Sequence, residues 1–261
     1  MFLKGKTALV TGSTSGIGAA CARALAAEGA VVMINGFGEK AVIGGLLAEL
    51  AALSGADARH NAADLADATQ VAALAEACTA ELGEVDILIH NAGIQHVCPI
   101  DEFPIEKWRQ MMAIMVDAPF LLTRALLPGM KARGWGRIIA MASAHASVAS
   151  PNKSAYIVAK HGMLGMMKTV ALEVAQAGIT ANCISPGYVW TPLVENQIPN
   201  TMQTRGMTRE QVINDVLLAT TPQRKFVMPE QVAAMVTFLC SEAASAITGA
   251  NMPIDGGWTA H

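Results

Sequence analysis

Short apolar runs alternate along this chain with longer stretches rich in alanine and leucine. The apolar runs predict strands at Thr7–Thr11, Val31–Ile34, Ala58–Asn61, Ile87–His90, Arg137–Met141, Thr180–Ser185 and Ala250–Ile254. The stretches 19–29, 40–53, 67–82, 104–131, 155–176 and 229–242 have the composition and apolar spacing of helices. Continuous apolar strands that alternate with helices predict a parallel sheet with helices on both faces.

Length and composition favour one domain built on such a sheet. Of the 261 residues, 52% are hydrophobic and 15% are charged, which is enough for one deep core. No linker or charge run divides the chain, so residues 1–261 are expected to form a single-domain, doubly wound Rossmann-type α/β fold. Region 186–222 contains Pro186, Pro192, Pro199 and Pro222, and we expect it to be an irregular lid over a substrate.

The same composition argues against several classes of partner. A net charge of −3 gives no electrostatic case for nucleic acid. The five cysteines are far apart without C-x-x-C spacing, so neither a metal site nor disulfides are expected. No signal peptide opens the sequence, and no apolar run approaches the ~20 residues of a membrane helix. We therefore expect a cytoplasmic protein, and the low charged fraction favours a surface covered by further copies of the chain.

A glycine-rich turn joins the first predicted strand to the first helix, in the order Gly12-Ser13-Thr14-Ser15-Gly16-Ile17-Gly18. Gly12 permits a tight turn, Gly16 lets the backbone approach a pyrophosphate, and Gly18 lets the helix pack closely on the strand. The helix N-terminus offers free N–H groups and a positive dipole end to phosphate. An ordinary βα turn can carry incidental glycines, but the strand before and the helix after favour nucleotide binding.

The spacing of this turn is T-G-x-x-x-G-I-G, and here the chain resembles the short-chain dehydrogenase/reductase family. Asn91-Ala92-Gly93, Tyr156-x-x-x-Lys160 and Pro186-Gly187 extend the resemblance over nearly the whole length, in the same order. The resemblance implies a dinucleotide held by Gly12, Ser13, Thr14, Ser15, Gly16, Ile17, Gly18, Phe37, Asp64, Leu65, Asn91, Ala92, Gly93, Tyr156, Lys160, Pro186, Gly187, Val189 and Thr191.

The residues after the second strand bear on which dinucleotide is bound. An NADP enzyme needs a cation for the 2′-phosphate, and 13–15 and 35–38 contain none. Lys40 is the nearest, and it is expected to begin the next helix. The acidic residue that marks NAD is also missing, so NAD is predicted by exclusion, with Phe37 against the adenosine. Asp64 should accept from the adenine amino group, although it could instead cap the helix that begins near Asp67.

Oxidation of an alcohol needs a base for the hydroxyl proton. Tyr156 and Lys160 are four residues apart on a predicted helix, so both project from one face. The tyrosine pKa of about 10 must fall by roughly 3, worth about 4 kcal/mol, and a nearby ammonium favours tyrosinate. The resemblance implies that Tyr156 is the acid/base, that Lys160 holds ribose and lowers the tyrosine pKa, and that Ser143 orients the substrate.

Met115 departs from the family, which commonly has Asn there to continue the proton relay from the lysine through a water. If the relay uses the backbone carbonyl at this position, Met115 can supply it. If it needs the amide side chain, the relay is altered.

Polar residues around the expected hydride site suggest a substrate with a carboxylate. Gln95, His145, Lys153 and Gln197 offer one cation and several donors, although each alone could be an ordinary solvated residue. Together they resemble the 3-hydroxybutyrate dehydrogenases, which implies oxidation of (R)-3-hydroxybutyrate to acetoacetate by a homotetramer. Trp258 is expected near the pocket, and Tyr188 stands where those enzymes commonly have Trp.

Two alternatives remain open. A short-chain reductase of another small hydroxy or oxo acid, or of a 3-oxoacyl thioester, would share the catalytic residues; a thioester reductase would prefer NADPH. A nucleotide-binding protein without catalysis is expected to lose Tyr156 or Lys160, and both are present.

Overall fold

Seven parallel strands form one sheet in the order β3-β2-β1-β4-β5-β6-β7. The computed structural model describes residues 1–260, apart from the side chains of Leu193 and Asn200. The strands are β1 (Thr7–Val10), β2 (Val31–Asn35), β3 (Arg59–Asn61), β4 (Ile87–His90), β5 (Gly136–Met141), β6 (Ile179–Pro186) and β7 (Asn251–Ile254). Each predicted strand is present within two residues of its expected ends, which confirms the doubly wound α/β fold.

The strand order reverses beside β1. The chain runs from β1 outward to β2 and β3, then crosses to β4 on the other side of β1, where Ala8 aligns with Ile87. Loops after β1 and β4 therefore diverge and leave a crevice at the carboxyl ends of these strands. Open α/β sheets bind ligands at such a point.

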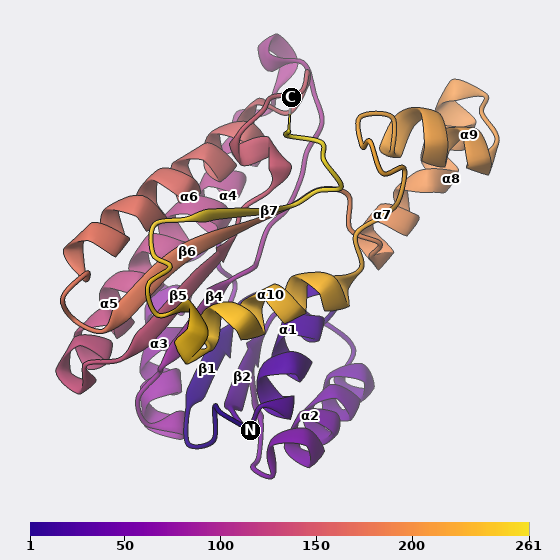
Figure 1. Cartoon of the computed structure of the whole chain (residues 1–261). Helices are drawn as coiled ribbons and strands as arrows, with labels where there is room; N and C mark the ends of the chain where they lie inside the picture. The colour runs from indigo at the N-terminus through magenta and orange to yellow at the C-terminus, as the bar shows by residue number, and fades with distance from the viewer. Residues whose placement is uncertain (261) are drawn as a thin grey trace.

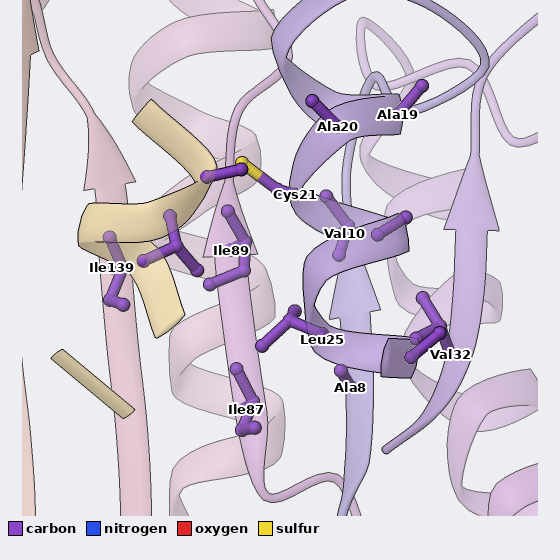
Figure 2. Packing of buried hydrophobic residues seen from close by; sticks show 14 of the residues in the cluster. Ala8, Val10, Ala19, Ala20, Cys21, Leu25, Val32, Ile87, Ile89 and Ile139 are labelled. Atoms are coloured by element: carbon purple, nitrogen blue, oxygen red, sulfur yellow. The ribbon is translucent and has the colours of Figure 1, made fainter. Parts of the chain in front are cut away.

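One face of the sheet is covered by α1 (Gly16–Ala27), α2 (Lys40–Ser54) and α10 (Pro229–Cys240) (Figure 1). Figure 2 shows Cys21 and Leu25 of α1 in one cluster with Val10 of β1 and Ile89 of β4. All four side chains are fully buried. Close packing of small residues such as Ala22 lets α1 lie near the strands, and this fixes where its N-terminus points.

The other face is covered by α3 (Ala68–Leu82), α5 (Ala118–Arg133) and α6 (Ser154–Glu173). The predicted helix 104–131 is divided into α4 (Ile105–Met112), a π-helical turn (Ala113–Asp117) and α5. The combined run Ile105–Arg133 is long and apolar enough, by length and composition alone, to cross a membrane. The expectation that no run approaches that length was therefore wrong, although Leu122, Leu126 and Met130 lie buried against this sheet face.

Region 186–222 is largely helical, so the expectation of an irregular segment was also wrong. It contains α7 (Pro192–Glu195), α8 (Gln197–Arg205), α9 (Arg209–Gln211) and a π-helical turn (Val212–Leu217). The Thr191 side chain caps α7, and Thr208 forms a capping box with Gln211 on α9. Pro192 and Pro199 lie in first turns of their helices, where proline is tolerated. In Figure 1 these helices project from the body of the protein. Short 3₁₀ turns at Ile100–Glu102, Ala144–Ala146 and Glu242–Ala244 complete the elements.

Candidate active site

A groove of about 410 Å³ lies where the turns after β1, β2 and β4 meet. Many residues predicted to hold the dinucleotide line it, namely Gly12, Thr14, Ser15, Gly16, Ile17, Phe37, Asp64, Leu65, Asn91, Ala92, Gly93 and Thr191. Gly187 and Val189 lie on a neighbouring cavity instead. Ser13, Gly18, Lys160 and Pro186 line neither cavity.

Hydrogen bonds brace the glycine-rich turn against the turn after β4. The Asn91 side-chain amide donates to the carbonyls of Thr11 (2.9 Å) and Gly12 (2.8 Å). The Thr11 hydroxyl accepts from the backbone N–H groups of Asn91 (3.0 Å) and Ala92 (3.1 Å). A Cβ on Gly18 would lie 2.5 Å from both Asn91 Nδ2 and Gly12 O, so only glycine fits this position. Gly18 and Asn91 therefore shape the groove by packing and bonding within the protein.

The N-terminus of α1 faces the groove with groups that are free to bind. Ser15 is the N-cap residue of α1 and makes no side-chain capping hydrogen bond. Its hydroxyl and the first N–H groups of α1 are therefore available to a phosphate. Ser13 differs, because it is fully buried and its hydroxyl donates to Val10 O at 2.6 Å.

The far end of the groove has no cation among the described lining residues. Asn35 closes this end, where its amide donates to Asn61 O and Ala63 O. Phe37 is exposed, as expected of an apolar surface that a ring can cover. Asp67, not Asp64, caps α3 by accepting from Thr69 N and Gln70 N, so the capping alternative for Asp64 was wrong. This groove, with its free helix N-terminus, fits a dinucleotide.

A second cavity of about 160 Å³ adjoins the groove and brings together the predicted reaction and substrate residues. Ile17 and Thr191 line both cavities. The described lining residues are Ile17, Gln95, Ser143, His145, Lys153, Tyr156, Gly187, Tyr188, Val189, Thr191, Val194, Gln197 and Trp258. Every substrate-contacting residue predicted from the sequence is on this wall.

Ser143 and Tyr156 approach each other from two elements. Ser143 follows β5 in an extended conformation, and its hydroxyl accepts from His145 N at 3.2 Å. Tyr156 lies in the first turn of α6. Burial raises the pKa of Tyr156, while a hydrogen bond with Ser143 lowers it. In the protein alone, burial is the larger of these effects, so a lowered tyrosine pKa requires further positive charge.

Lys160 lies one turn beyond Tyr156 and is buried. Its ammonium donates to Met141 O at 2.5 Å and lies 5.5 Å from the centroid of the Tyr156 ring. Burial lowers the pKa of Lys160 to about 8. This ammonium is thus close enough to act on Tyr156, and it can exchange a proton near neutral pH.

Aromatic rings form one wall of the cavity. The His145 ring meets the rings of Tyr156 (6.0 Å between centroids) and Trp258 (4.9 Å) edge to face. Trp258 stacks on Tyr188 at 5.7 Å with an interplanar angle of 2°. Burial, helped by the charge of Lys153, lowers the pKa of His145 to about 4, so this imidazole is neutral at pH 7. His145 Nε2 is 2.8 Å from Ser150 Oγ.

Lys153 supplies the cation of this cavity. It precedes α6, and its Nζ lies 5.9 Å from the centroid of the Tyr188 ring. No described acidic side chain forms an ion pair with it. Burial lowers the pKa of Lys153, and an anion bound beside it would favour its charged form. Gln95 and Gln197 add exposed amide groups to the same wall.

Met115 lies in the π-helical turn and is fully buried. A Cβ built on Gly93 would be 3.4 Å from Met115 Sδ and 3.8 Å from Lys160 Nζ, so the thioether and the ammonium are close to the same glycine. Where the family resemblance leads one to expect an amide, this chain therefore places a weak hydrogen-bond acceptor in an apolar cluster.

Six groove residues, Asn35, Gly36, Ala63, Ile94, Ile114 and Pro192, were not among the predicted dinucleotide contacts. Asn35 and Gly36 lie in the 35–38 segment already examined for the ribose, and Ala63, Ile94 and Pro192 are sequence neighbours of predicted residues. Ile114 reaches the groove through the π-helical turn, which apolar spacing does not reveal. Within residues 1–260, no cluster of three or more His, Cys, Asp or Glu could hold a metal ion, and all five cysteines are free thiols.

Comparison of the sequence with known proteins places this chain among oxidoreductases. Residues 12–259 match the family model described as enoyl-(acyl carrier protein) reductase. The chain is 50% identical to D-beta-hydroxybutyrate dehydrogenase of Rhizobium meliloti (strain 1021) over 255 residues, covering 98% of this chain and 99% of the relative. It is 46% identical to the enzyme of the same name from Cupriavidus necator, over 99% of both chains.

Solved structures agree with this placement. The crystal structure of L-sorbose reductase from Gluconobacter frateurii, complexed with NADPH and L-sorbose, superimposes with a TM-score of 0.93. The two chains are 33% identical, and the alignment covers 100% of each.

Proposed function

The chain belongs to the short-chain dehydrogenase/reductase family of oxidoreductases, and we propose that it catalyses the reversible, NAD-dependent oxidation of (R)-3-hydroxybutyrate to acetoacetate. The observation that carries this proposal is the position of Lys153. Its ammonium, which forms no ion pair with an acidic side chain within residues 1–260, lines the same small cavity as Ser143 and Tyr156. A cavity of about 160 Å³ suits a substrate of few atoms, and a cation at its wall suits a carboxylate.

Each residue has a role in this proposal. Lys153, with Gln95, His145 and Gln197, binds the carboxylate and so orients the hydroxyl toward Tyr156. Ser143 donates a hydrogen bond to the substrate oxygen, and Tyr156 accepts the hydroxyl proton. Lys160 stabilises the tyrosinate by charge and can pass its proton onward, because its pKa is about 8.

NAD, held by the residues that line the groove, would supply the hydride acceptor and a positive charge that favours tyrosinate. The choice of NAD over NADP rests on the far end of the groove, where no described lining residue is cationic. A 2′-phosphate there would find no cationic partner among these lining residues. Helices α7 to α9 are proposed to cover the bound substrate, since Val194 and Gln197 line the cavity. A cytoplasmic location and a homotetramer remain predictions.

The test is a spectrophotometric screen of dinucleotide reduction with NAD and with NADP. The substrates are (R)- and (S)-3-hydroxybutyrate, a 3-hydroxyacyl thioester and an uncharged secondary alcohol. We expect activity with NAD and the (R) acid. Activity confined to uncharged alcohols would overturn the carboxylate assignment, and comparable kcat/KM with both dinucleotides would overturn the choice of NAD. Preference for the thioester with NADPH would favour the alternative reductase.

A further inference from the structure

Both tyrosines of this chain line the same cavity, although the proposed reaction uses only one. Tyr188 is not one of the four residues proposed to bind the carboxylate, although Lys153 Nζ lies 5.9 Å from the centroid of its ring. The other lining residues that have no role in the proposed reaction are mainly apolar, namely Ile17, Val189, Val194 and Trp258, with Gly187 and Thr191. Tyr188 is therefore a polar group on a surface that otherwise suits a hydrocarbon end of a substrate.

The position of the Tyr188 ring is fixed. Val227 N donates to Tyr188 O at 2.9 Å, and the preceding Gly187 N donates to Ile254 O at 2.9 Å. The ring stacks on Trp258, so both its backbone and its plane are held. A ring held in this way presents its hydroxyl at a defined place at little cost in conformational entropy.

The hydroxyl of Tyr188 has no hydrogen-bond partner among the described residues. The described side-chain polar atoms that are fully enclosed and lack a partner belong to other residues. It is therefore accessible. Burial raises the pKa of Tyr188, so the phenol stays protonated and can both donate and accept. A methyl group placed against this hydroxyl would remove its solvent without replacing the hydrogen bond, which is unfavourable.

From these observations we propose that Tyr188 selects hydroxy acids that carry a second hydroxyl group beyond the reacting carbon, of the 3,4-dihydroxybutyrate class. This inference rests on the proposed hydroxy-acid oxidation and names a further substrate of the same site. The (S) enantiomer is the relevant one, because the terminal hydroxyl changes the naming priority and leaves the arrangement in space that of (R)-3-hydroxybutyrate.

The chemistry at carbon 3 is unchanged. The C3–H bond breaks and its electron pair leaves as hydride to the oxidised nicotinamide dinucleotide. The C3 hydroxyl proton passes to Tyr156, a C=O bond forms, and the product is 4-hydroxy-3-oxobutyrate. The terminal hydroxyl does not react; it exchanges a hydrogen bond with Tyr188.

The test compares kcat/KM for (S)-3,4-dihydroxybutyrate and (R)-3-hydroxybutyrate in the wild type, in Tyr188→Phe and in Trp190→Phe. Trp190 is the matched control, because it packs on Phe226 at 4.9 Å and does not line this cavity. In Tyr188→Phe we expect the ratio of the two values, dihydroxy over monohydroxy, to fall about tenfold or more. Trp190→Phe should leave this ratio unchanged.

Other outcomes separate the two proposals. A ratio that Tyr188→Phe changes less than about twofold, including an equal loss on both acids, overturns the role of Tyr188. If the wild type oxidises neither acid but oxidises butan-2-ol, the carboxylate assignment fails, and the ratio for butane-1,2-diol over butan-2-ol then decides the role of Tyr188. Inactivity toward all four compounds counts against both proposals.

Discussion

Replacing Lys153 by Gln tests whether the cavity recognises a carboxylate by charge. The substitution removes the positive charge and keeps a polar side chain, shorter by one atom, that can still donate a hydrogen bond. Lys153 forms no ion pair with a described acidic residue, so the fold should not depend on its charge. The lost interaction is then the one with the substrate.

The size of the loss follows from the setting of Lys153. Opposite charges about 4 Å apart attract by about 1 kcal/mol in water and about 4 kcal/mol near a protein surface. Lys153 is half-buried in a small cavity, so a value of about 2–3 kcal/mol is expected. This corresponds to a roughly 30- to 150-fold lower kcat/KM for (R)-3-hydroxybutyrate. Most of the loss should be in KM, because the carboxylate keeps its charge throughout the reaction.

The assay measures kcat and KM from the absorbance of the reduced dinucleotide, with the (R) acid and with butan-2-ol. Lys168→Gln is the matched control, since Lys168 is an exposed lysine on α6, the helix that Lys153 precedes, and lines neither cavity. Lys153→Gln should leave butan-2-ol within about threefold of the wild type. An unchanged KM for the acid, or an equal loss on the alcohol, would refute the charge argument.

Three further predictions follow from buried positions. Gly18→Ala should lower the free energy of unfolding, measured by urea titration, by about 1–3 kcal/mol, because the added Cβ would meet Gly12 O. Gly44→Ala in α2 has open space around it and should raise the free energy of unfolding by about 0.5–1 kcal/mol. Equal effects of the two substitutions would contradict the close packing at Gly18. Burial lowers the pKa of His90 to about 3, below its unfolded value of about 6.5, so its contribution to stability is present above pH 6.5 and is lost as the pH falls toward 3. Between pH 7 and pH 4.5 the free energy of unfolding should therefore fall about 2–3 kcal/mol less in His90→Asn than in the wild type. If the free energy of unfolding has the same pH dependence in both proteins, His90 is protonated in the folded state. Met115→Asn should destabilise the protein in the same titration by about 1–3 kcal/mol, because it buries an amide in an apolar cluster, and should change kcat less than tenfold; a larger rise would show that the proton relay needs the amide.

The parts of the fold that the sequence predicted are those that local pattern controls. Strand β4 is buried along its whole length, and Ile87, Leu88 and Ile89 make it largely apolar. The turn residues at the ends of β1 and β4 are adjacent in sequence to those strands. Helices α7 and α9 could not be found in this way. They are short and depend on the caps of Thr191 and Thr208, which a search for apolar spacing does not detect.

The site was predicted as a set of residues but not as a geometry. That Trp258 contacts both His145 and Tyr188 follows from β7 pairing with β6, which brings together segments about 70 residues apart. The bond from Lys160 to the Met141 carbonyl likewise depends on how α6 packs beside β5. Such contacts are set by tertiary packing, and neither propensity nor motif spacing contains them.

The strand order has a consequence for how the protein is made. Most of the nucleotide groove comes from residues 12–94, whereas the substrate cavity draws on residues from Ile17 to Trp258. At a synthesis rate of about 5–20 residues per second, residues 94 and 258 emerge about 8–33 s apart. Until β5 arrives, β4 is an open edge of the growing sheet, and its unpaired backbone and apolar side chains can associate with other chains. A fragment that stops before β7 would carry most of the nucleotide groove without a complete place for the substrate.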